Sequence, residues 1–286
     1  MKNDFEPVLV KFPLEQKLIR IYPIADCHIG SRECDEDAIK RWVEIVKSDA
    51  AGYCVIAGDM CDMGLKSSKT NCYEETMPPH EQKERFYELF SPISDKILAI
   101  VPGNHEGRCV REVGLNPLYD IACRWRIEDR YRENACFLEV TVGKKPKDHK
   151  NSQNVYGVVV THGASRNKYI NWTSTVDGAD LFISGHIHEN DEQDFGKLVF
   201  DHNAKQVRQA EYIKHICTPF MRYGGYALNG HYRPSALPKL EVFTLMGDGK
   251  KIEYSKTVLL DKPVIKILAF LIFPLTLRIL RRIIGI

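Results

Sequence analysis

The chain has 286 residues, of which 44% are hydrophobic and 27% charged, and its formal net charge is +2. These values exclude a disordered or collagen-like chain and fit one large α/β domain or two small ones. Residues 262–286 contain five basic and no acidic residues, so residues 1–261 carry a net charge of −3. An acidic body disfavours nucleic-acid binding through bulk charge, although a local basic groove stays open.

Nine cysteines are scattered along the chain without a Cys-x-x-Cys pair. This pattern argues against a disulfide framework or a zinc ribbon and favours a reducing compartment. The first residues, MKNDFEPVLVKF, carry charges where an export signal needs an apolar run. We therefore expect a cytoplasmic protein.

Strands and helices are predicted to alternate in the first part of the chain. In chain order they are a strand at 17–24, a helix at 35–47 with Asp35 as N-cap, a strand at 53–57, a helix at 80–90, a strand at 97–101, a helix at 117–127, and strands at 137–142 and 155–161. Strands dominate afterwards, at 181–184, 197–201, 211–217, 239–246 and 251–258. This order predicts an α/β fold of two packed sheets with helices on their outer faces.

Five of the predicted strands end in a short loop that carries Asp, His or Asn. The polar residues of these loops are Asp26, His28, Asp59, Asp62, Asn104, His105, His162, His186 and His188. Because ligands of open α/β sheets bind beyond the carboxyl ends of strands, the five loops are expected to converge. The other histidines are expected on the surface or in loops: His80, His149, His202, His215 and His231.

The converging side chains suit divalent ions such as Mn, Fe, Zn, Co or Ni rather than Ca. No cysteine is among them, which disfavours a closed structural zinc site. Because the donors exceed the needs of one ion, we expect two ions about 3.5–4 Å apart that share a carboxylate. Residues i and i+2 of an extended segment point the same way, which predicts extended backbone at Asp26 with His28 and at His186 with His188. Close approach of the backbone is expected at Gly58, Gly103, Gly163 and Gly185.

The ordered set of motifs resembles that of the calcineurin-like metallophosphoesterase superfamily. It consists of Asp26-x-His28, Gly58-Asp59-x-x-Asp62, Gly103-Asn104-His105-Glu106, His162-Gly163 and Gly185-His186-x-His188. The resemblance spans residues 17–188 and implies a four-layer α/β/β/α sandwich of two mixed sheets, which the later strands would complete. It also implies a two-metal-dependent phosphoesterase that hydrolyses a phosphate mono- or diester.

The resemblance further implies individual roles. The first ion would be held by Asp26, His28 and His188, the second by Asn104, His162 and His186, and Asp59 would bridge both. His105 would not bind metal but would protonate the leaving oxygen as general acid, and Asp62 would orient it and raise its pKa. The two ions, Mn²⁺ before Fe, Zn, Co or Ni, would lower the pKa of a bridging water and so provide the attacking hydroxide.

One position departs from the phosphoprotein phosphatases of this superfamily, which have an arginine directly after the second Asp of Gly-Asp-x-x-Asp. Met63 stands there in this chain, which disfavours protein phosphatase activity. Arg108 and Arg111 are expected to bind the substrate phosphate instead, with Arg108 preferred. Further candidates at the mouth of the site are Arg166, Lys168, Tyr169, residues 222–226 and His231.

The sequence leaves several substrates open: a soluble phosphate mono- or diester, a nucleic-acid end cleaved by a nuclease of the DNA-repair type, or a lipid-linked pyrophosphate. A metal-bound scaffold without turnover is a further alternative. The oligomeric state is also left open.

The last residues form a segment of their own. Residues 1–261 are expected to form the metallophosphoesterase domain and residues 262–286 a hydrophobic and basic tail. The uncharged run 267–277 is short for a membrane span, and it precedes Arg278, Arg281 and Arg282. This predicts peripheral contact with an anionic membrane surface, with packing on the body or on another subunit as the alternative.

Overall fold

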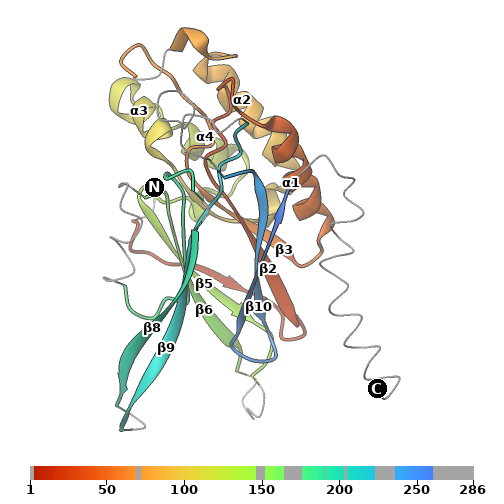
Figure 1. Cartoon of the computed structure of the whole chain (residues 1–286), viewed down its shortest axis with the longest axis vertical. Helices are drawn as coiled ribbons and strands as arrows, with labels where there is room; N and C mark the ends of the chain where they lie inside the picture. Colours follow the sequence, from red (N-terminus) through yellow and green to blue (C-terminus); the bar gives the residue numbers. More distant parts are fainter. Residues whose placement is uncertain are drawn as a thin grey trace.

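The computed structural model describes residues 3–68, 72–145, 152–163, 176–189, 191–202, 205–222 and 236–259. Two mixed β-sheets pack against each other, and helices cover the outer face of one of them (Figure 1). The strands of the five-stranded sheet are β2 (Leu18–Ile24), β3 (Gly52–Ala57), β4 (Ile97–Val101), β10 (Lys239–Met246) and β11 (Ile252–Val258). Their order across the sheet is β11-β10-β2-β3-β4, and β2, β3 and β4 are parallel.

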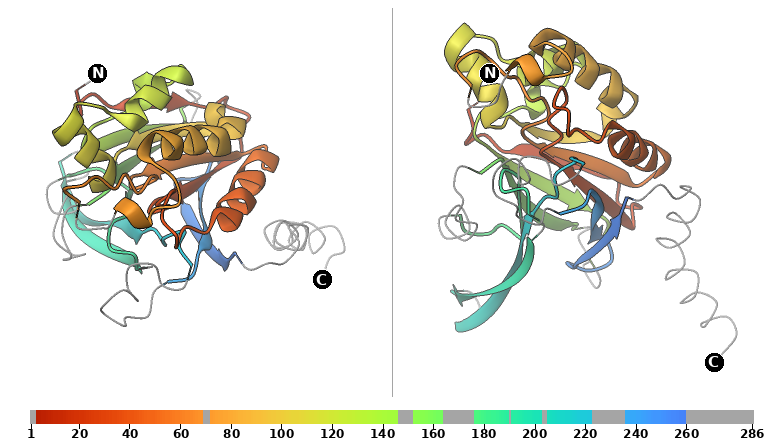
Figure 2. Two further views of the ribbon diagram at one scale, coloured as in Figure 1. Left: turned by 90° about the horizontal axis from the view of Figure 1, so that it is seen from above. Right: turned by 45° about the horizontal axis from the view of Figure 1, so that its top comes forward.

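The other sheet has six strands. They are β1 (Val8–Lys11), β5 (Ala135–Val142), β6 (Asn154–Thr161), β7 (Leu181–Ser184), β8 (Asp191–Asp201) and β9 (Gln206–Ile216). Their order is β1-β5-β6-β7-β9-β8, with β6, β7 and β9 parallel. Strands β8 and β9 form a long antiparallel hairpin at one edge of this sheet, and its tip extends beyond the other strands (Figures 1 and 2).

The helices lie over the five-stranded sheet (Figure 2). They are α1 (Glu36–Ser48), α2 (Pro79–Phe90), α3 (Asn104–Val113) and α4 (Pro117–Arg124), with the 3-10 helices η1 (Cys72–Glu74), η2 (Ser91–Lys96) and η3 (Glu128–Arg130). The expected pair of packed mixed sheets with outer helices is confirmed. The second helical layer of a four-layer sandwich is not among the described residues.

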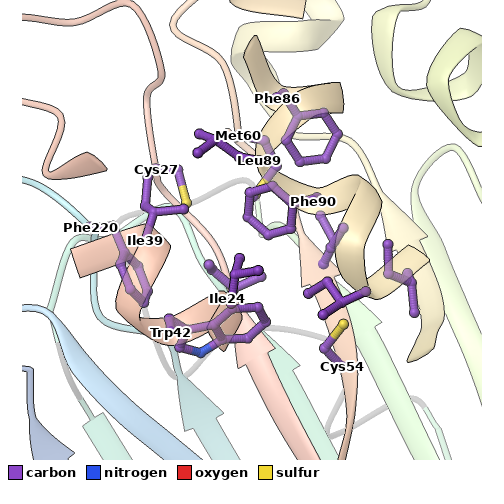
Figure 3. Close-up of a cluster of buried hydrophobic side chains, with 14 of the residues drawn as sticks. Ile24, Cys27, Ile39, Trp42, Cys54, Met60, Phe86, Leu89, Phe90 and Phe220 are labelled. Carbon is purple, nitrogen blue, oxygen red and sulfur yellow. The ribbon is translucent and has the colours of Figure 1, made fainter. Parts of the chain in front are cut away.

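The strands that carry the site are buried on both faces, which explains their nearly continuous apolar sequences. In β2, Tyr22 and Ile24 face the helices, whereas Ile19 and Ile21 face the other sheet. Figure 3 shows the helix-side core, where Trp42 of α1 lies beside Ile24. This double packing holds the ends of the strands, and therefore the loops that follow them, in one place.

Most predicted elements lie within two residues of the observed bounds, and three differ. The helix predicted at 117–127 ends at Arg124, because Arg126 adopts a left-handed φ of 60°. Strands β8 and β9 begin earlier than predicted, because their first halves, residues 191–196 and 206–210, are largely polar and gave no hydrophobic alternation. Asn104 and His105, expected in a loop, begin α3.

Candidate metal centre

The site forms where strands of both sheets end. In the five-stranded sheet, Ile24 pairs with Ile56 and Ala57 with Val101, so β2, β3 and β4 end at a common edge. In the other sheet, Val160 pairs with Ile183, which aligns the ends of β6 and β7. The segments that follow these five strands bring all nine predicted polar side chains into one cluster of mutual contacts.

One group of donors consists of Asp26, His28 and His188. The Nε2 atoms of His28 and His188 lie 3.1 Å apart. His188 Nε2 lies 3.3 Å from Asp26 Oδ1, and His28 Nε2 lies 3.9 Å from the same oxygen. These three side chains therefore point at a common position.

A second group consists of Asp59, Asn104, His162 and His186. His162 Nε2 lies 3.1 Å from Asp59 Oδ2 and 3.2 Å from Asn104 Oδ1. His186 Nδ1 lies 2.8 Å from Asn104 Oδ1. Asp59 lies between the groups, since its Oδ2 is also 4.0 Å from His28 Nε2. These are the residues for which the family resemblance implied two ions with a shared aspartate, an assignment that stays a prediction.

The backbone that presents these residues is left-handed, so the expectation of extended segments is wrong. Asp26 and His28 have φ of 53° and 46°, Asp59 has 51°, and His186 and His188 have 76° and 59°. The loops after β2 and β3 pair in this conformation, because Asp26 N–H donates to Gly58 O and His28 N–H to Asp59 O. Each left-handed residue other than glycine costs about 1 kcal/mol or more, and such strain concentrates at functional sites.

Two glycines let these loops approach closely. A Cβ on Gly103 would lie 2.0 Å from Asp59 Oδ1, and a Cβ on Gly58 would lie 2.6 Å from His162 Nδ1. Gly58 also has φ of 86°. A side chain at either position would push donor groups out of the cluster, as the sequence analysis expected for these glycines.

The hydrogen bonds of the imidazoles fit metal ligation. His162 Nδ1 donates to the carbonyl of Ala57, a bond of 2.8 Å, and His28 Nδ1 lies 3.1 Å from Asp62 Oδ1. A ring nitrogen engaged in this way orients the other nitrogen toward a cation, which is the usual outer shell of a metal-binding histidine. The donor set of carboxylate, amide and imidazole therefore fits divalent ions of the Mn, Fe or Zn type.

The pKa shifts of Asp59 and His162 also fit a site for a cation. Burial alone would raise the pKa of Asp59, but His162 and His105 hold it well below its usual value. Burial lowers the pKa of His162, but Asp59 and Asp26 outweigh burial and raise it to about 10. The carboxylates thus favour the protonated form of His162. Because a histidine must lose this proton to ligate a metal, a dication at this position would bind more weakly as the pH falls.

His105 is buried at the start of α3, next to the donors. Its Nδ1 lies 2.7 Å from the carbonyl oxygen of Asp62 and 3.2 Å from Asp62 Oδ1. Burial lowers the pKa of His105, but Asp59 and Asp62 outweigh it, and the pKa is raised. One carboxylate oxygen of Asp62 thus contacts both His105 and the candidate ligand His28, a sharing that the sequence analysis did not foresee.

The two candidate phosphate-binding arginines differ in position. Arg108 Nη2 lies 2.9 Å from His105 Nε2. Arg111 is exposed and lines a cavity of about 760 Å³ together with Asn104 and His162. Met63 is buried in the helix-side core, so that position does not present a side chain to a phosphate.

Among the further candidates at the mouth of the site, only Arg222 lies within the described residues. Arg222 pairs with Asp37 at 2.9 Å, at the start of α1. Arg166, Lys168, Tyr169, residues 223–226, His231 and the tail 262–286 lie outside the described residues. No helix in the described parts of the chain is long and apolar enough to cross a membrane.

Glu106 is a structural residue of the site to which the sequence analysis gave no role. Its buried carboxylate accepts hydrogen bonds from the N–H groups of Asp59 (3.1 Å), Cys61 (2.9 Å) and Gly103 (2.8 Å). It therefore ties the segment after β3 to the start of α3. Its position, three residues after the N-cap Gly103, is the sequence signal for such a cap.

Glu75 is a second residue that the sequence analysis missed, since no motif includes it. Burial and the neighbouring Asp62 raise the pKa of Glu75 from 4.5 to about 7. The folded protein thus favours protonated Glu75, whereas the unfolded chain ionises it near its usual pKa. Between these two values the folded state binds more protons, so stability must fall as the pH rises.

We expect a Glu75→Gln variant to lack this pH dependence. From about pH 5 to 8, the melting temperature of the wild type should fall by about 1–2 °C relative to the variant, a small effect because Glu75 is partly exposed. Differential scanning fluorimetry across this range measures it. Glu74→Gln, at an exposed neighbour, is the control, and parallel curves for the wild type and Glu75→Gln would contradict the prediction.

Comparisons with known proteins agree with the fold. The model of the family described as "calcineurin-like phosphoesterase" matches residues 19–190, a range that contains the whole cluster. No curated protein matches the chain.

Two solved structures are similar at a distance. One is GAP50, described as the anchor in the inner membrane complex of Plasmodium, with a TM-score of 0.42 and 12% identity over 87% of each chain. The other is the NAD nucleotidase NadN of Haemophilus influenzae, with a TM-score of 0.36 and 9% identity. That match covers 84% of this chain but only 49% of NadN. At these scores neither structure informs the function of this chain.

Proposed function

Because this chain belongs to the calcineurin-like phosphoesterase family, we propose that it is a two-metal hydrolase that cleaves a phosphate mono- or diester. The observation that supports this most is the pair of donor groups on either side of Asp59, which come from five separate segments of the chain. A fold that needed only hydrogen bonds would have no reason to gather four imidazoles around two buried carboxylates.

The proposed ligands of the first ion are Asp26, His28 and His188, those of the second are Asn104, His162 and His186, and Asp59 is shared. When bound, two divalent ions supply positive charge to the phosphate oxygens and lower the pKa of a water to make it a nucleophile. Mn²⁺ is the ion to test first, because oxygen and imidazole donors suit it and no thiol belongs to the set.

His105 is proposed as the general acid and Asp62 as the residue that positions it. His105 Nδ1 faces Asp62, so the proton must leave from Nε2, the nitrogen that Arg108 contacts in this structure. An arginine only donates hydrogen bonds, so this contact holds Nε2 as an acceptor. We propose that Arg108 moves from His105 to an incoming phosphate, which allows a protonated Nε2 to face the leaving oxygen.

Arg111 is proposed to contact the part of the substrate that lies in the cavity. That cavity begins at Asn104 and His162 and continues along α3. Apart from the proposed ligand His162, the charged lining residues in the described part of the chain are Arg111 and Glu133, one of each sign. This charge balance favours a small ester over a nucleic-acid strand, which needs a row of cations.

Hydrolysis of two chromogenic esters with Mn²⁺ tests the function. We expect turnover of p-nitrophenyl phosphate, bis-p-nitrophenyl phosphate, or both, loss of turnover with EDTA, and recovery on addition of Mn²⁺. Cleavage of the monoester alone would exclude the diesterase and nuclease alternatives, and single- and double-stranded DNA are tested in parallel. Equal rates with and without the chelator would contradict the proposal.

One further prediction concerns the C-terminal segment and its contact with a membrane. The division into a domain at 1–261 and a tail at 262–286, with contact to an anionic membrane, stays a prediction. Sedimentation with anionic liposomes, with and without residues 262–286, measures it.

A further inference from the structure

A second group of potential metal ligands lies apart from the nine residues of the candidate metal centre. It consists of His215 on β9, Cys217 just beyond the end of β9, and Glu241 on β10. The exposed fractions of these residues are 0%, 1% and 1%. The expectation that His215 lies at the surface or in a loop is therefore wrong, because β9 carries it into the space between the sheets.

The three side chains converge from different sheets. His215 Nε2 lies 3.0 Å from Glu241 Oε2, and one potential ligand atom of each residue lies within 4.8 Å of the others. The donor pairs of the candidate metal centre have similar separations, such as 3.1 Å between His28 Nε2 and His188 Nε2. The N–H of Thr218 donates to Glu241 Oε2 at 3.3 Å, which helps to orient the carboxylate.

The two ring nitrogens of His215 differ: Nε2 faces Glu241, and Nδ1 is buried without a hydrogen-bond partner among the described residues. An ion shared with Glu241 would bind Nε2, in the space where the three side chains converge. A buried carboxylate, thiol and imidazole are costly to desolvate unless they are paired or bound to a metal. A dication with one thiolate and one carboxylate is electrically neutral, so its burial among these ligands avoids a net charge.

We propose that His215, Cys217 and Glu241 bind a single divalent transition-metal ion, with Zn²⁺ as the expected occupant. Thiolate, imidazole and carboxylate together select a borderline-soft ion of this type, and they disfavour Mg²⁺ and Ca²⁺. The ion joins β9 of one sheet to β10 of the other. Three protein ligands leave one position of a tetrahedral zinc ion for a further donor such as water. The site does not depend on the proposed phosphoesterase activity.

Backbone hydrogen bonds connect the segment around Cys217 to two segments of the candidate metal centre. Three residues after Cys217, the N–H of Phe220 donates to the carbonyl oxygen of Asp26 at 3.0 Å. Cys217 N–H donates to the carbonyl of Ser184, two residues before His186. An ion at Cys217 would therefore hold the backbone against which Asp26 and the segment after β7 are placed.

Cobalt substitution distinguishes this site from the candidate metal centre, because the centre has no thiol ligand. Full-length protein is produced in medium that contains Co²⁺ in place of Zn²⁺, and its absorption spectrum is recorded. We expect a thiolate-to-cobalt charge-transfer band in the near ultraviolet, since only a cobalt-bound thiolate produces it. The band should be lost in Cys217→Ser and persist in Asp59→Asn.

Matched variants identify the thiol and guard against misfolding. Cys136→Ser, at a cysteine buried in the same space between the sheets, should keep the band. Cys27→Ser, next to Asp26 and His28, should keep it as well. If Cys217→Ser does not fold, the test is Glu241→Gln, whose bound cobalt should fall by about one equivalent relative to the wild type. Absence of the band in the wild type, or its survival in folded Cys217→Ser, would overturn the proposal and leave a buried histidine–glutamate pair.

Discussion

Replacing Asp59 by asparagine is expected to lower phosphoesterase activity by at least about 10³-fold, and to reduce the amount of bound divalent metal. Asp59 Oδ2 lies 3.1 Å from His162 Nε2 and 4.0 Å from His28 Nε2, between the two donor groups. The amide keeps the size of the side chain but removes the negative charge that both ions would share. Several kcal/mol of electrostatic stabilisation of the transition state would be lost with the ions.

Two measurements check this result: kcat/KM on p-nitrophenyl esters with Mn²⁺, and metal content by inductively coupled plasma mass spectrometry. Asp248→Asn, at an exposed residue in the turn between β10 and β11, is the control and should keep both activity and metal. Circular dichroism confirms that the variant is folded. A folded Asp59→Asn protein with wild-type metal content and rate would refute the bridging role.

Replacing His105 by glutamine is expected to lower turnover by about 10²–10⁴-fold while metal content stays unchanged. The loss should be largest for an alkyl phosphate and smaller for a nitrophenyl ester, because a nitrophenolate leaves without the help of an acid. His105 also lies 3.8 Å from Asp59 Oδ2 and within a potential ligand group with His28. Metal content therefore separates the two roles, and loss of metal in His105→Gln would mean that His105 is a ligand.

The pH dependence of His105 gives a second readout. The carboxylates of Asp59 and Asp62 outweigh burial and raise the pKa of His105. In the metal-loaded enzyme the ions would take up the charge of Asp59, and Asp62 would be the carboxylate that still favours the acid form of His105. If protonated His105 is the acid, kcat/KM falls as the pH rises above this pKa. This decline should be missing in His105→Gln and present in the control His80→Gln, an exposed histidine on α2. An unchanged profile in His105→Gln would exclude the acid role.

The sequence was a good guide to the strands and to the residues that gather at their ends. The strands around the site are buried on both faces, so each appears as a short apolar run that stops at a polar residue. That local contrast predicted β4 and β7 to the residue, and it identified Asp26, Asp59 and His162 before any contact was known. Parallel strands in register then bring such residues together without further information.

The backbone at the ligands could not be predicted from the sequence. Alternation in Asp26-x-His28 suggested extended segments, but both residues are left-handed. Non-glycine residues adopt this conformation only where surrounding contacts impose it, here the bonds from Asp26 N–H to Gly58 O and from His28 N–H to Asp59 O. Those bonds join segments about 30 residues apart in the sequence, so no local pattern reports them.

The sequence by itself determined which polar side chains gather at the candidate metal centre and on which strand ends they lie, because apolar runs and polar stops are local features. Only the tertiary structure decided that Asp62 serves His28 and His105 together, that Arg108 contacts His105, and that His215 meets Glu241 between the sheets. The physical reason is that these contacts join elements whose relative positions are set by the packing of whole sheets and helices. Neither their distances nor their burial exists until that packing is complete.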